Sequence, residues 1–133
     1  KRTEITPPIG LPMAGFGDRK GPSNGVHDPL WCTAFSMSDG KLIILYLILD
    51  LVAIDTELVS FLRKLILSEL NIPFENIQIV CTHTHSGPAG FRGLKNTSTL
   101  NDSGNKFEKE RKIIIFNLKL NKLNIIKRKG DTR

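Results

Sequence analysis

The chain has 133 residues, 40% of them apolar and 24% charged, which fits one soluble globular domain and excludes a disordered chain. The net charge of +6 is divided unevenly. Residues 1–90 carry 7 Lys or Arg against 9 Asp or Glu, whereas residues 91–133 carry 12 against 4. The basic segment, residues 91–133, lacks RNP-like signatures and zinc knuckles, which argues against nucleic-acid binding. The remaining explanations for its charge are a solvated surface or a peripheral attraction to acidic lipid. The longest apolar run, 42–49, is far shorter than the roughly 20 residues that span a bilayer.

The first half of the sequence predicts a loop-rich start followed by a β-hairpin. Glycine and proline are frequent before residue 30, which indicates a winding surface segment rather than a helix. Strands are expected over residues 30–37 and 41–49, joined by the tight-turn sequence Ser38-Asp39-Gly40. Because the second run is apolar at successive positions, we expect that strand to be buried on both faces.

A helix is expected after the hairpin. From Asp55 onward the apolar residues recur at intervals of three and four, which predicts a helix over residues 56–70 with one apolar face. Asp55 or Thr56 can cap its first amide groups. Asn71 and Pro73 are expected to end it.

A further apolar run, residues 77–82, completes a β-α-β crossover with the strand 41–49 and the helix. Such a crossover predicts that the two strands are parallel neighbours. The expected fold class is therefore α/β, with a mixed sheet that contains this crossover. Cys32 and Cys81 lie in strand-like runs, so both are expected to be small buried side chains, and two cysteines exclude a disulfide scaffold.

The last third of the sequence is less regular. Residues 91–106 are polar and are expected to form a loop. Residues 106–120 fit a helix or a strand, with the helix favoured, and residues 123–127 are a last strand candidate.

The strongest chemical signal is the pair His83 and His85 at the end of the predicted strand 77–82. On an extended backbone, residues i and i+2 project to the same side, so both imidazoles are expected to face one point. Ligands of open α/β sheets gather beyond the carboxyl ends of strands, and Gly87-Pro88 turns the chain there. Imidazole is a common zinc ligand, so the pair predicts a metal site. Two histidines that only hydrogen-bond the backbone are the alternative.

Two other side chains are candidates to support this site. Asp50 ends the neighbouring strand 41–49, where its carboxylate can accept a hydrogen bond from the other ring nitrogen of a ligating histidine. A carboxylate that caps a turn or a helix entry is an equal alternative for Asp50. His27 can approach from the loop-rich segment, although a surface or loop-anchoring role is favoured. Serine catalysis lacks support, because Ser86 has no GxSxG motif.

The segment CTHTHSGP at residues 81–88 resembles the neutral/alkaline non-lysosomal ceramidase family, amino-terminal domain. The resemblance depends on five motifs in the family's order over residues 5–90, which are far more specific together than singly. The other matching segments are ITPPIG with MAGFG (5–10 and 13–17), GVHDPL (25–30), Asp39-Gly40 and LDLV (49–52).

This resemblance implies a zinc-dependent amidase that cleaves the N-acyl bond of ceramide to sphingosine and a fatty acid. It implies Zn²⁺ as cofactor, a ceramide-like lipid as partner, His83 as a zinc ligand and His85 as the catalytic residue beside the reacting amide. Zinc activates water and polarises an amide carbonyl, and an imidazole can then donate a hydrogen bond or move a proton. The family indicates a secreted or membrane-associated protein.

The chain departs from the family pattern in the ligands that are expected downstream. The family's other ligands are a histidine, a glutamate and a tyrosine, whereas the only other histidine is His27 and the only tyrosine, Tyr46, lies within a predicted strand. Residues 91–133 match weakly, and the chain starts at Lys1 rather than methionine. We therefore expect residues 1–133 to be the amino-terminal part of a larger ceramidase-type catalytic domain. The alternative is a catalytically incomplete fragment that at most binds lipid or a partner chain.

Overall fold

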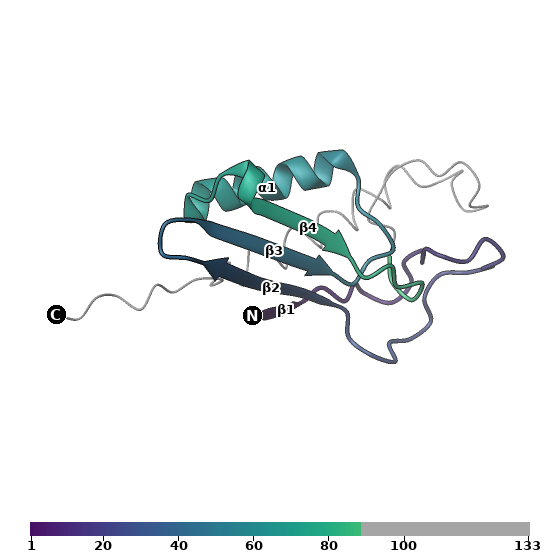
Figure 1. The fold of residues 1–133 in the computed structure, drawn as a ribbon. Coiled ribbons are helices and arrows are strands. Elements are labelled where there is room, and N and C mark those ends of the chain that lie inside the picture. The colour runs from purple at the N-terminus through teal and green to yellow at the C-terminus, as the bar shows by residue number, and fades with distance from the viewer. Residues whose placement is uncertain (89–133) are drawn as a thin grey trace.

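The computed structural model describes residues 1–88, which form a four-stranded mixed sheet with one long helix packed along it (Figure 1). None of the helices within this part is long and apolar enough to cross a membrane. The elements expected over residues 91–106, 106–120 and 123–127 lie outside the described residues. In chain order the elements are β1 (Arg2–Glu4), β2 (Trp31–Ser38), β3 (Ile43–Leu49), α1 (Thr56–Leu70), the 3₁₀ helix η1 (Phe74–Asn76) and β4 (Ile77–Cys81).

The sheet has the strand order β1-β2-β3-β4. Its first two pairs are antiparallel and β3 pairs parallel with β4, which confirms the predicted hairpin and crossover. At the hairpin turn, the Asp39 carboxylate accepts hydrogen bonds from the amides of Leu42 at 2.8 Å and Lys41 at 2.9 Å. These bonds hold the pKa of Asp39 below its usual value. Gly40 has a φ of 92°, a conformation that favours glycine.

Strand β1 is not predicted by the sequence. Its three residues are too few to show a periodic pattern, and they form a strand because they pair with β2. The Arg2 guanidinium lies 4.2 Å from the centre of the Trp31 ring, and the Lys1 amino group donates to the Ala34 carbonyl at 2.6 Å. Residues 5–29 contain no helix or strand, as predicted.

Helix α1 has the expected bounds. The Asp55 carboxylate accepts a hydrogen bond from the Leu58 amide at 2.8 Å, so Asp55 rather than Thr56 is the cap. Asn71 adopts a left-handed φ of 55°, and its amide donates to the Leu67 carbonyl at 2.9 Å. This is a common way for a helix to end, because it satisfies one of the last free carbonyl groups.

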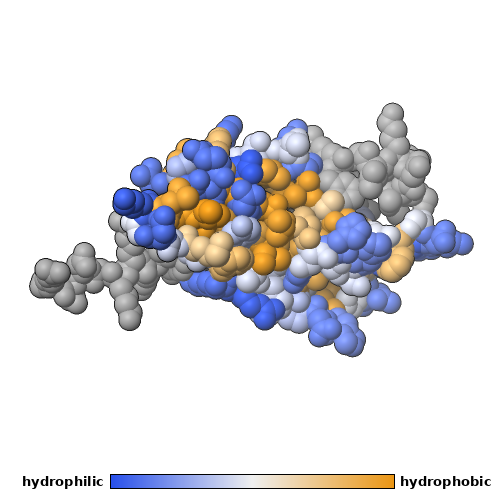
Figure 2. All heavy atoms as spheres, viewed as in Figure 1, coloured by the Kyte–Doolittle hydropathy of each residue, from blue (hydrophilic) through white to orange (hydrophobic). Residues whose placement is uncertain are grey.

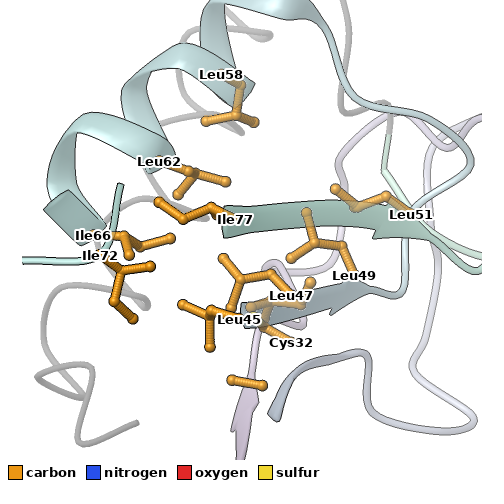
Figure 3. Close-up of a cluster of buried hydrophobic side chains, with 12 residues drawn as sticks. Cys32, Leu45, Leu47, Leu49, Leu51, Leu58, Leu62, Ile66, Ile72 and Ile77 are labelled. Carbon is orange, nitrogen blue, oxygen red and sulfur yellow. The ribbon is translucent and has the colours of Figure 1, made fainter. Parts of the chain in front are cut away.

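The hydrophobic core lies between α1 and one face of the sheet (Figure 3). Side chains alternate along a strand, so every second residue of β3 faces the helix. Full burial of an aliphatic side chain contributes roughly 1.5–3 kcal/mol, so this layer is a main source of stability. The core side chains of β3, β4 and α1 are Leu45, Leu47, Leu49, Ile77, Leu58, Leu62 and Ile66.

Strand β3 is fully buried on one face only, which corrects the expectation of burial on both faces. Ile44, Tyr46 and Ile48 are half-buried, because α1 covers one side of the sheet within residues 1–88. The Tyr46 ring stacks on the Phe35 ring of β2, with centroids 4.7 Å apart and planes 3° from parallel. Figure 2 shows apolar side chains gathered over the middle of the molecule in this view.

The two cysteines lie on different strands, separated by β3. Cys32 is buried, as predicted, and burial raises the pKa of its thiol to about 12. Cys81 is half-buried, which corrects the expectation that it is buried, and its partial burial also raises the pKa of its thiol. Both are free thiols.

A matched pair of substitutions on α1 tests which helix face supports the fold. Leu62→Ala should lower the free energy of unfolding by about 2–5 kcal/mol, because Leu62 is 1% exposed and its truncation leaves a cavity. Leu67→Ala should cost about 0.5 kcal/mol or less, because Leu67 is 40% exposed. Urea unfolding followed by circular dichroism measures both values. Equal losses in the two variants would contradict the packing of α1.

Candidate functional site

The two histidines lie in the loop that follows β4, beside the segment that follows β3. The Thr82 amide donates to the Leu49 carbonyl at 2.9 Å, and the His83 amide donates to the Leu51 carbonyl at 3.0 Å. Backbone hydrogen bonds therefore continue beyond the last residue of β4. They hold the loop at the carboxyl end of two parallel strands, the expected place for a ligand site in an α/β sheet.

The backbone at the first histidine is not extended, which corrects the geometry predicted from the sequence. His83 has a φ of 62°, in the left-handed region that residues other than glycine rarely adopt. The rule that residues i and i+2 share a face therefore does not apply here. The two imidazoles still lie together, with ring centroids 5.0 Å apart and planes at 67°. His83 is exposed and His85 is half-buried.

The His83 ring is oriented by a backbone group. Its Nδ1 lies 2.8 Å from the carbonyl oxygen of Val52. A carbonyl oxygen can only accept, so Nδ1 carries the hydrogen and the neutral ring keeps an unprotonated Nε2. Histidines that ligate metals usually have this arrangement, because the bond fixes both the tautomer and the ring orientation.

Asp50 has a different partner from the one that the sequence suggests. Its carboxylate accepts a hydrogen bond from the Trp31 amide at 2.9 Å, and its own amide donates to the Trp31 carbonyl at 2.9 Å. The Val52 carbonyl takes the position at His83 that was expected for the carboxylate. Asp50 therefore joins the start of β2 to the end of β3, a partner between strands that neither alternative from the sequence predicted.

The His85 ring is held by residues that the sequence analysis did not single out for the site. The Phe16 ring meets it edge-on, with centroids 5.0 Å apart, and Arg19 donates from Nη2 to the His85 carbonyl at 2.9 Å. Gly15 passes so close that a Cβ there would overlap the His85 ring. The only signal in the sequence is the MAGFG motif, some 70 positions away, so the contact depends on the fold.

A cavity of about 520 Å³ lies beside the histidine loop. His27, Thr84 and Ser86 are among the residues that line it. The His27 ring is exposed, and its Nδ1 lies 2.7 Å from the Asp28 carboxylate. Of the four predicted site residues, the structure thus brings together His83 and His85. His27 lies at the cavity, and Asp50 bonds to Trp31 instead of to a histidine.

The imidazole pair does not form a complete metal site within residues 1–88. In this part of the chain, no three side chains of His, Cys, Asp or Glu gather closely enough to hold a metal ion. A catalytic zinc usually has three protein ligands and an open position. Such a site would therefore need ligands other than those described.

The family model described as "Neutral/alkaline non-lysosomal ceramidase, N-terminal" matches residues 2–112. The chain belongs to this family. The solved structure of neutral ceramidase from Pseudomonas aeruginosa has a similar fold, with a TM-score of 0.68 and 23% identity over 89% of this chain. A ceramidase complexed with C2 is also similar, with a TM-score of 0.66 and 24% identity over 87% of this chain.

These matches confirm the resemblance that was found from the motifs, and they confirm the α/β fold class. The chain spans only 20% and 19% of the lengths of the two ceramidase chains. No curated protein matches the chain.

The hydrogen bond from His83 to Val52 predicts one tautomer of the neutral ring. Long-range ¹H–¹⁵N spectra of the labelled chain should show His83 protonated on Nδ1, because the carbonyl of Val52 has no hydrogen to donate. His27, whose Nδ1 lies 2.7 Å from the Asp28 carboxylate, is the reference in the same chain for a ring with hydrogen on Nδ1. A His83 ring protonated on Nε2 would show that the bond to Val52 is absent in solution.

Proposed function

We propose that this chain contributes to a zinc-dependent amide hydrolase that cleaves the N-acyl bond of ceramide, giving sphingosine and a fatty acid. Membership of the ceramidase family supports the reaction class. The observation that carries the proposal is the His83 ring, whose Nδ1 bonds to Val52 and whose Nε2 is left available at the carboxyl end of the sheet.

In this proposal, His83 holds the metal through Nε2. The donor set fits zinc in its chemistry, because imidazole nitrogen is a usual zinc ligand. It is incomplete in number, because the described residues bring together only two imidazoles. Bound zinc would supply a Lewis acid that polarises the amide carbonyl and the attacking water. The contribution of this chain is a ligand whose tautomer and direction are set before the metal binds.

His85 is the proposed catalytic residue. Within residues 1–88 neither of its ring nitrogens has a hydrogen-bond partner, so both are available to a substrate amide beside His83. From that position the ring can donate a hydrogen bond to the oxygen on which charge develops, or move a proton to the leaving amine. Asp50 supports the site indirectly, by holding the start of β2 against the end of β3.

Substitution of each histidine in the complete gene product separates the two roles. His83→Ala should lose both zinc and hydrolysis of ceramide, because a ligand is removed. His85→Ala should keep its zinc and lose turnover by about 10²–10⁴-fold, the usual contribution of a general acid or base. Metal content and activity are measured on the same preparations, with Leu67→Ala, at an exposed position of α1, as the control that keeps both.

Two outcomes of this experiment would contradict the assignment. If His85→Ala is free of metal while His83→Ala keeps its zinc, the two roles are reversed. If the complete gene product hydrolyses no ceramide and contains no zinc, the alternative of a domain that only binds lipid or a partner chain replaces the proposal.

The 133-residue chain alone should bind zinc weakly and show no measurable amidase activity. Affinity and geometry at a catalytic zinc require at least three protein ligands, and the described residues bring two imidazoles together. Metal analysis of the purified chain before and after dialysis against a chelator measures this. Stoichiometric zinc that survives the chelator would show that this chain supplies a complete ligand set.

A further inference from the structure

Four contacts from the segment Ala14–Arg19 converge on the loop that carries His85. We propose that this segment is a positioning device for the His85 ring and that Arg19 is its central positioning residue. The inference rests on the catalytic role proposed above for His85.

The contacts of Ala14 and Gly15 set the position of the His85 ring. The Ala14 amide donates to the Gly87 carbonyl at 2.9 Å, which joins the segment to the end of the histidine loop. Gly15 follows with a φ of 108°, a conformation suited to glycine, and leaves no room for a Cβ against the His85 ring. Glycine is therefore needed at position 15 for two reasons: the positive φ and the lack of space for a side chain.

The next contacts set the orientation of the ring. The Phe16 ring meets the His85 ring edge-on, at 78° between planes, and the His83 ring meets it at 67°. Edge-to-face packing of this kind favours a defined mutual orientation. The His85 ring is therefore bounded by Phe16 and His83, while its nitrogens have no hydrogen-bond partner within residues 1–88.

Arg19 connects these contacts. A turn brings the Arg19 amide to 3.3 Å from the Phe16 carbonyl and places the guanidinium 5.2 Å from the centre of the Phe16 ring. From there Nη2 reaches the His85 carbonyl at 2.9 Å. One side chain thus contacts both the ring that orients His85 and the backbone that carries it.

The Arg19 guanidinium is only partly satisfied by hydrogen bonds within residues 1–88. Its Nη1 is buried and has no hydrogen-bond partner in the described part of the chain. An unsatisfied buried donor destabilises a fold, and Arg63 carries the same cost, so this cost by itself does not distinguish the two arginines. What distinguishes Arg19 is its hydrogen bond to the backbone of His85. The position of a catalytic ring matters, because a misplacement of about 1 Å can lower turnover by about 100-fold.

Imidazole spectra of the full 133-residue chain test the proposal without zinc or ceramide, so the result does not depend on the proposed reaction. In long-range ¹H–¹⁵N spectra, Arg19→Gln should displace the His85 ring signals and leave those of exposed His27 in place. Arg19→Lys should restore part of the displacement, because an ammonium group can still donate to the His85 carbonyl.

Arg63→Gln is the matched control. Arg63 also donates from Nη2 to a backbone carbonyl, that of Ile77 at 3.0 Å, and its Nε is likewise buried without a partner in residues 1–88. This variant should lower the midpoint of thermal unfolding and leave the His85 signals in place. Unmoved His85 signals in Arg19→Gln, or an equal displacement in Arg63→Gln, would overturn the proposal.

Phe16→Leu keeps the test decisive if Arg19→Gln does not fold. Phe16 is 57% exposed, so the fold should tolerate this change. Loss of the aromatic ring should displace the His85 ring protons, because the ring current of Phe16 disappears. Unchanged His85 protons in the folded Phe16→Leu chain would likewise overturn the proposal.

Discussion

The parallel pairing of β3 with β4 is the constraint on which the rest of the structure depends. Leu49 lies opposite Cys81 at the end of this ladder, and the hydrogen bonds from Thr82 and His83 to the segment after β3 continue it. Because the strands run in the same direction, their carboxyl ends meet at one edge. The loop that carries both histidines therefore lies against the segment that contains Val52.

This pairing is stabilised by the helix that connects the two strands. The crossover places α1 on one face of the sheet, where its apolar stripe buries the alternate leucines of β3 (Figure 3). Burial on that face leaves the strand ends and their loops free to carry polar groups. The rigid part of the fold and the part that presents the imidazoles are thus separate segments of the same β-α-β unit.

The site combines groups from three distant stretches of the chain. The Val52 carbonyl directs His83, the Ala14–Arg19 segment packs on His85, and Asp50 ties the start of β2 to the end of β3. The hydrogen bonds of His83, Arg19 and Asp50 each use a backbone carbonyl or amide as one partner. Backbone groups occur at every residue, so no sequence motif marks which of them will serve. The imidazole pair was therefore predictable, whereas the groups that orient it were not.

The sequence by itself determined the crossover, the bounds of its helix and the presence of two histidines at a strand end. These features depend on local periodicity and on stop residues such as Asn71. The choice of Asp55 over Thr56 as the helix cap came from the structure. Only the tertiary structure decided that β1 is a strand, that His83 leaves the extended conformation, and that Phe16 and Arg19 lie on His85. The reason is physical: these features arise from contacts between residues far apart in the chain, and such contacts form only when the sheet brings the segments together.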